Sequence, residues 1–96
     1  MDVEALTYSG PGLEATGDDW ALMVWFPNDS RADWKVSWES DFRLTGETDD
    51  RGEPIHEPRV LRFESYDTVA ALSAFIYEWV PVESDANLIL AKVASR

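Results

Sequence analysis

Apolar and polar residues alternate over most of the first two thirds of the chain, which is the pattern of β-strands in a sheet with one covered face. The run Trp20–Phe26 is apolar throughout, as in a central strand that is covered on both sides. From Trp34 to Leu44 every apolar residue falls at an even position, so one long or bent strand keeps them all on one face. Arg59–Glu64 alternates again and predicts the next antiparallel strand, with Leu61 and Phe63 turned toward the core.

The remaining segments complete the expected fold. Val3–Tyr8 predicts a short edge strand that runs into a Gly-Pro-Gly turn. Ser65 is a suitable N-cap for a helix that ends at Pro81, since apolar residues recur between them at spacings of three and four. Leu88–Ala94 is apolar enough on both faces to be predicted as a last strand inside the sheet. The apolar stripe of the helix consists of Val69, Leu72, Phe75, Ile76 and Trp79.

The order of elements is therefore strand, strand, strand, strand, helix, strand, in a single domain over residues 1–96. A run of strands followed by a helix is typical of the α+β class, because the helix has to bury its apolar stripe against one face of the sheet. We expect an antiparallel sheet of four to five strands with one helix packed on one face.

The segment 45–58 has no hydrophobic periodicity. It contains two Gly, two Pro and five acidic residues, so it cannot build a core. We predict a long, exposed acidic loop, and loops of this length are often contact surfaces. The alternative is that the segment only extends a hairpin.

The strongly acidic composition limits the kinds of partner that the protein can bind. The chain has 19 acidic and 8 basic residues, which gives a net charge of -11, yet 45% of its residues are apolar and five are Trp. This composition excludes a disordered acidic tail. An acidic protein is repelled by nucleic acid and by anionic membranes, so the expected partner is a basic protein. The sequence has no apolar run long enough to span a bilayer, and we expect the protein in the cytoplasm, that of the host if a phage encodes it.

Candidate chemistry is sparse. The chain has no Cys, which excludes disulfides and thiolate chemistry. Asp18-Asp19 and Asp49-Asp50 are neighbouring carboxylates in expected loops, where solvation is the better interpretation than a catalytic dyad. His56 is the only His, and the acidic stretch before it lacks the spacing of a calcium loop. We expect no enzyme activity, no cofactor and no metal site.

The Trp residues divide into two groups. Trp34, Trp38 and Trp79 lie on faces that also carry aliphatic residues, and we expect them in the core. Trp20 and Trp25 form the second group, which the pattern does not assign to the core. If Trp25 and Met23 point away from the helix, they form an exposed patch, and aromatic anchors surrounded by charge are typical of binding interfaces. The alternative is that the N-terminal strand or the long loop covers them.

Three accounts explain the acidity. In the first, surface carboxylates stand in for phosphates and occupy the basic surface of a nucleic-acid-handling protein. Phage inhibitors of bacterial immunity, including anti-CRISPR and anti-restriction proteins, share this general composition, although no family motif carries the likeness. In the second, the chain is an immunity protein that neutralises a toxin nuclease, and in the third, acidity is an adaptation to high salt.

We prefer the first account, in which the protein is a non-enzymatic inhibitor that acts by protein–protein contact. An exposed edge strand with aromatic neighbours could in addition support a homodimer. The candidate partner-binding residues are Asp18, Asp19, Trp25, Glu39, Asp41, Glu47, Asp49, Asp50, Glu53, Glu83 and Asp85.

Overall fold

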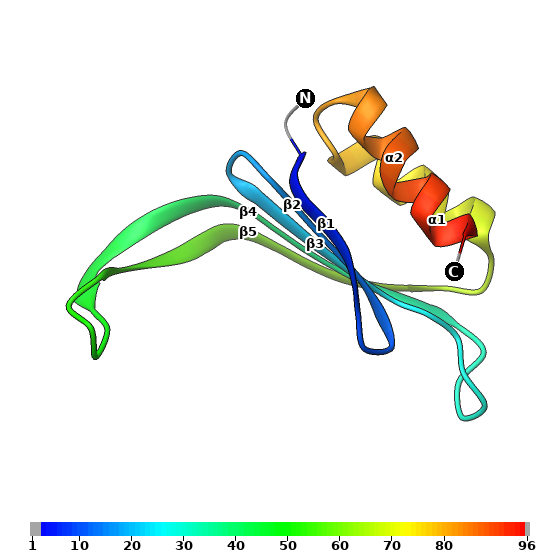
Figure 1. The fold of residues 1–96 in the computed structure, drawn as a ribbon, viewed down its shortest axis with the longest axis horizontal. Helices are drawn as coiled ribbons and strands as arrows, with labels where there is room; N and C mark the ends of the chain where they lie inside the picture. The colour runs from blue at the N-terminus through cyan, green and yellow to red at the C-terminus, as the bar shows by residue number, and fades with distance from the viewer. Residues whose placement is uncertain (1–2, 96) are drawn as a thin grey trace.

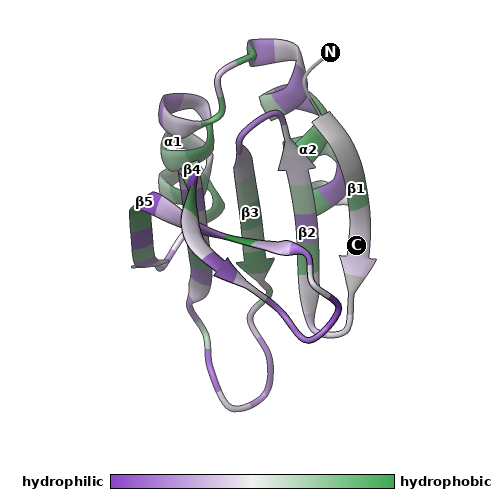
Figure 2. Cartoon of the chain, turned by 90° about the vertical axis from the view of Figure 1, so that its left-hand side faces the viewer, coloured by the Kyte–Doolittle hydropathy of each residue, from purple (hydrophilic) through white to green (hydrophobic). Residues whose placement is uncertain are grey.

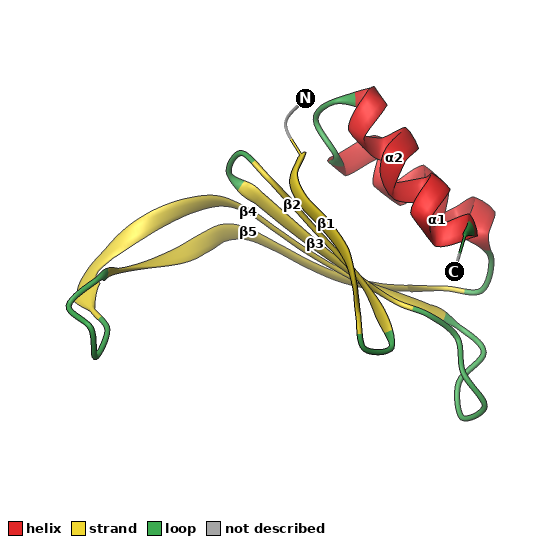
Figure 3. Cartoon of the chain, viewed as in Figure 1, coloured by secondary structure: helices red, strands yellow, loops and turns green. Residues whose placement is uncertain are grey.

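The computed structural model describes residues 3–95 as one antiparallel sheet with two helices on one face (Figures 1 and 3). Each strand pairs with the next one along the chain, so the sheet is a meander in the order β1-β2-β3-β4-β5. The elements are β1 (Val3–Ser9), β2 (Gly12–Gly17), β3 (Trp20–Trp25), β4 (Trp34–Thr48), β5 (Pro54–Tyr66), α1 (Val69–Trp79) and α2 (Glu83–Ala94).

The core lies between the sheet and the helices. Leu22 of β3, Val36 of β4 and Leu13 of β2 point toward the helices and are almost completely buried. Trp20 and Trp38 stack on each other with ring centroids 5.4 Å apart, and Trp79 of α1 lies 6.1 Å from Trp38. Trp34 and Trp79 pack against this core, which confirms the expectation that Trp34, Trp38 and Trp79 are core residues.

The helix expected after the strands is present as α1. It buries Leu72, Phe75 and Ile76, three members of the predicted stripe. Its N-cap is Thr68, whose Oγ1 accepts a hydrogen bond from the backbone N–H of Ala71 at 3.2 Å, so the helix begins three residues later than a Ser65 cap would allow.

The last element differs from the prediction. Leu88–Ala94 is not a strand but part of α2, which begins at Glu83. The buried residues Ala86, Ile89 and Val93 recur at spacings of three and four, while Leu88 is 40% exposed. The α+β class is confirmed, whereas the single helix and the final strand are corrected to two helices that end the chain. Neither helix within residues 3–95 is long and apolar enough to cross a membrane.

The N-terminal half contains one strand more than expected. The strand predicted at Val3–Tyr8 is present as the edge strand β1, and the turn after it leads into β2. β2 has only Leu13 and Ala15 as buried apolar side chains, with glycines at both ends, so its pattern is weak in the sequence. It pairs with β3 in register from Gly12↔Trp25 to Gly17↔Trp20.

The side chains of β5 face the opposite way to the prediction. Leu61 and Phe63 lie on the face of the sheet that has no helix, and they are 51% and 67% exposed. The register decides this, because Arg62 lies opposite the buried Trp38 and therefore shares its face. The Arg62 guanidinium sits over the Trp79 ring, 5.3 Å from its centroid, and covers the edge of the core.

Candidate binding surface

The segment predicted as a long loop is instead a two-stranded ribbon. Pairing between β3 and β4 ends at Trp20↔Ser40, but β4 and β5 stay paired as far as Thr48↔Pro54. We call residues 41–58 the ribbon. It leaves the sheet and curves away from the helices, as the green strands of Figure 1 show. The hairpin extension that the sequence left open is thus the correct interpretation, and the loop proper is a short turn between the two strands.

The ribbon has little apolar cover. Leu44 is 60% exposed, and its partner in the register is the exposed His56. Figure 2 shows that hydrophobic residues concentrate in the central strands, whereas the end of the ribbon is mostly hydrophilic. A two-stranded ribbon of this kind gains little stability from burial, so it adds little to the core of the domain.

The turn at the tip of the ribbon is organised by Asp49. Its Oδ1 accepts hydrogen bonds from the backbone N–H groups of Arg51 at 2.8 Å and Glu53 at 3.0 Å. The backbone closes the same turn, since Asp49 N–H donates to the Glu53 carbonyl at 2.9 Å and Gly52 N–H donates to the Asp49 carbonyl at 3.0 Å. Gly52 has φ +80°, a conformation that other residues rarely adopt. One of the predicted contact residues therefore also shapes the turn.

The root of the ribbon is fixed by Asp19. This residue sits in the β2–β3 turn with φ +64°, and its Oδ1 accepts a hydrogen bond from Phe42 N–H at 2.8 Å. Its carbonyl accepts a second bond from Asp41 N–H at 3.2 Å. Asp41 itself has φ +56° in the middle of β4, directly after the last residue of β4 that pairs with β3. Asp18, Asp19 and Asp41 therefore form one acidic group at the root.

The other candidate residues fall into different regions. Glu39 and Trp25 lie on the face without helices, which we call the open face. Glu83 is exposed at the first turn of α2, in the helical layer. Asp85 is 0% exposed and belongs to the buried part of α2, so its carboxylate is not part of the surface. Glu47, Asp49, Asp50 and Glu53 are all exposed at the tip of the ribbon.

The open face carries an apolar patch. Met23 and Trp25 are partly buried on it, which is the arrangement in which the sequence predicts an exposed aromatic patch. Sequence reasoning missed the two most exposed members, Leu61 and Phe63, because it placed them in the core. Trp25 and Phe63 line an open groove of about 430 Å³ together with Arg31, Lys35, Val36, Glu64 and Ser65.

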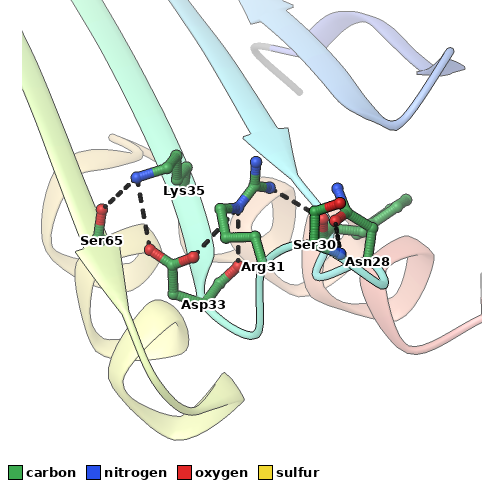
Figure 4. A network of polar contacts seen from close by, with 7 residues as sticks. Asn28, Ser30, Arg31, Asp33, Lys35 and Ser65 are labelled. Carbon is green, nitrogen blue, oxygen red and sulfur yellow. Dashed lines mark hydrogen bonds and ion pairs between the residues drawn. The ribbon is translucent and has the colours of Figure 1, made fainter.

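One side of this groove is held by a network of polar contacts around Arg31, Asp33 and Lys35 (Figure 4). Arg31 and Lys35 both contact the carboxylate of Asp33, at 3.1 and 3.4 Å, and Lys35 Nζ donates to Ser65 Oγ at 3.1 Å. Arg31 also donates to the carbonyl of Phe26 at 3.0 Å. Desolvation opposes the charged form of Asp33, but attraction to Lys35 and Arg31 and hydrogen bonds outweigh it, so the pKa of this carboxyl is lowered.

No metal centre is visible within residues 3–95, where no group of three His, Asp or Glu side chains is placed to hold an ion. His56 is exposed on the ribbon. Comparison of the chain with known protein families, with curated proteins and with solved structures gives no match.

Proposed function

We propose that the protein is a non-enzymatic inhibitor that binds a basic, nucleic-acid-handling protein and covers its nucleic-acid surface. The observation that carries this proposal is the ribbon. It extends past the sheet, adds little to the core and presents four carboxylates at its tip. A projecting acidic element on a chain of net charge -11 is suited to entering a positively charged groove.

The acidic groups of the ribbon are arranged at two levels. Asp18, Asp19 and Asp41 lie at the root, and Glu47, Asp49, Asp50 and Glu53 lie at the tip. The carboxylates of Asp19 and Asp49 accept hydrogen bonds from backbone N–H groups and hold the backbone at both levels, so the other carboxylates are presented on a fixed scaffold. Preorganised charges lose less conformational entropy on binding than charges on a mobile loop.

The proposed partner surface is one that normally binds phosphates. Such surfaces carry clustered Lys and Arg, and an acidic protein that covers them competes with nucleic acid for the same cationic side chains. We include in this proposal that the protein inhibits its partner in the way that phage anti-defence proteins inhibit theirs. A chain that neutralises a toxin nuclease would need the same acidic face, and the identity of the captured protein separates the two.

A pull-down with salt and DNA competition tests the proposal. The tagged chain is incubated with bacterial lysate at low salt, and bound proteins are identified after elution with salt or with duplex DNA. The proposal predicts one basic nucleic-acid-binding protein that either eluent releases. Retention that neither salt nor DNA reverses would contradict it.

A matched pair of variants makes the test local to the ribbon. In the first, Glu47, Asp50 and Glu53 are replaced by Lys, which spares the turn-forming Asp49. In the second, three exposed acids elsewhere are replaced by Lys, so that the net charge changes by the same amount. These control positions are Glu14, Asp29 and Glu78. The ribbon variant should lose at least about tenfold in affinity for the captured protein and the control clearly less. Equal losses would show that only the overall charge matters.

A further inference from the structure

The outer edge of β5 lies next to the exposed apolar side chains of Leu61 and Phe63. β5 is the last strand in the order, so no strand among residues 3–95 pairs with its outer side. Unpaired strand edges can bind another strand, and proteins usually protect them with Pro, charges or bulges. In β5 both prolines, Pro54 and Pro58, lie in the ribbon. The segment 60–66 has no Pro, and its register with β4 is regular.

The side chains of this segment are self-complementary when two copies run antiparallel. A symmetric antiparallel pair places one residue opposite its own copy, and the side chains of opposed residues share a face. With Phe63 on the axis, every charged residue of the segment faces an opposite charge. The opposed pairs are then Arg62 with Glu64, Val60 with Tyr66 and Leu61 with Ser65.

Neighbouring registers do not give this match. An axis on Arg62 or on Glu64 places like charges directly opposite each other, which is destabilising. An axis on Leu61 pairs Arg62 with Val60 and leaves both charges of the Arg62–Glu64 pair without an opposed partner across the edge. Within one chain Arg62 and Glu64 are 4.0 Å apart and about half exposed, so their contact is weak. Arg62 also lies over the Trp79 ring, and its exposed part is what can face a second copy.

We propose that two copies of this chain pair antiparallel along residues 60–66 of β5, with Phe63 opposite its own copy. The pairing joins the two sheets into one continuous sheet. On the open face beside the Trp25 groove, Phe63, which is 67% exposed in the single chain, meets its own copy. Leu61, which is 51% exposed, lies opposite Ser65 of the second copy. The side chains along this edge are largely exposed in the single chain, at Arg59, Leu61, Arg62, Phe63 and Ser65.

Cysteine substitution tests the register directly, since the chain has no Cys of its own. In Phe63→Cys the two thiols lie directly opposite each other, and opposed residues in an antiparallel pair are about 4.5 or 5.5 Å apart between Cα atoms, which permits a disulfide. The control is Leu44→Cys, at a similarly exposed position on the ribbon. Under mild oxidation Phe63→Cys should form covalent dimers at least about ten times faster than the control, because pairing raises the effective thiol concentration.

A charge-swap cycle tests the pairing without oxidation. Sedimentation equilibrium of the wild type should show a concentration-dependent mass approaching that of two chains. Arg62→Glu and Glu64→Arg should each weaken the dimer, and the double variant should restore it. Circular dichroism checks that each variant is folded, since Arg62 also covers Trp79. The proposal is overturned by a wild type that stays monomeric at high concentration, by a double variant no better than the single ones, or by equal cross-linking rates for the two Cys variants.

Discussion

The sheet core and the ribbon are built from the same two strands, β4 and β5, yet they differ in what holds them. Between Trp34 and Ser40 the strand β4 has β3 on one side and α1 over its face, and Val36 and Trp38 are almost completely buried. Beyond Asp41 the same strand has only β5 beside it and no helix above it (Figure 1). The core thus carries the folding free energy, whereas the ribbon presents charge.

Carboxylates have two roles in these regions: some hold the local structure and others lie at the surface. At the core side, Asp33 is held between two cations and contributes to local structure. On the ribbon, Asp19 and Asp49 bind backbone N–H groups, while Glu47 and Asp50 remain at the surface. A carboxylate that shapes the backbone and one that is available to a partner therefore need different tests.

Truncation in the core should have the largest effect on stability. Trp38→Ala removes a ring that stacks on Trp20 and contacts Trp79, and we expect a loss of about 3 to 5 kcal/mol in the free energy of unfolding. Leu44→Ala on the ribbon should stay within about 0.5 kcal/mol of the wild type, because its side chain is exposed. Urea unfolding followed by Trp fluorescence measures both.

If Trp38→Ala fails to fold, Ile76→Val gives the same comparison on a smaller scale, with an expected loss of about 0.5 to 1.5 kcal/mol. Equal stability changes in core and ribbon variants would contradict the division of roles.

The next effect in size is at the root of the ribbon. Asp19→Ala removes the acceptor of the Phe42 N–H and places Ala at φ +64°, so we expect a loss of about 1 to 2 kcal/mol. Asp19→Asn keeps an acceptor oxygen and tolerates this conformation, and should be nearly as stable as the wild type. Thermal unfolding of the two variants shows whether the hydrogen bond from Phe42 N–H or the negative charge of Asp19 stabilises the root. Equal destabilisation by Ala and Asn would mean that the negative charge, and not the hydrogen bond, holds the root.

At the tip of the ribbon, substitutions that weaken partner binding should leave the stability of the fold unchanged. Replacing Glu47, Asp50 and Glu53 by Lys should leave the unfolding free energy within about 0.5 kcal/mol of the wild type, since these positions are exposed. Asp49→Ala should instead disturb the turn, because two backbone N–H groups lose their acceptor. Amide hydrogen exchange at Arg51 and Glu53 reports on this directly, and unchanged protection in Asp49→Ala would show that the turn does not need its side chain.

The smallest expected effect is the pH dependence of the Asp33 contacts. The pKa of Asp33 is lowered in the folded chain from an ordinary value of 3.8, so its charged form adds stability above that pH. This contribution is lost as the pH falls through the folded pKa. The melting temperature of Asp33→Asn should therefore lie below that of the wild type at pH 7, and the difference should shrink below pH 3.8. A difference that stays constant down to this range would exclude the ion pairs as its cause.

The central strand and the first helix could be predicted from local pattern alone. Trp20–Trp25 is apolar throughout, and α1 has a clear stripe with few competing signals. The second helix could not, because the short apolar run at Leu88–Leu90 fits a buried strand as well as a buried helix. Whether Leu61 or Arg62 faces the core depends on the register with β4, which no local pattern contains.

The candidate site was predictable in composition and not in geometry. Net charge and the acidic stretch around Asp49 pointed to a contact surface, and the structure places these residues on a ribbon. The roles of Asp19 and Asp85 depend on tertiary contacts. Asp19 binds the backbone of Phe42, 23 residues away, and Asp85 is buried in the helical layer. Such roles are invisible until distant segments are brought together.

The most direct test of the ribbon's proposed role in binding is a capture experiment with a chain that lacks residues 41–59. In this variant Ser40 is joined to Val60 through an Asn-Gly turn, which suits their opposed positions in the register. We predict that it folds with a melting temperature modestly below that of the full chain, because the hydrogen bond from Phe42 N–H to Asp19 is lost with the ribbon. It should no longer retain the basic protein that the full chain captures. Retention of that protein at unchanged affinity by the folded, shortened chain would contradict the account.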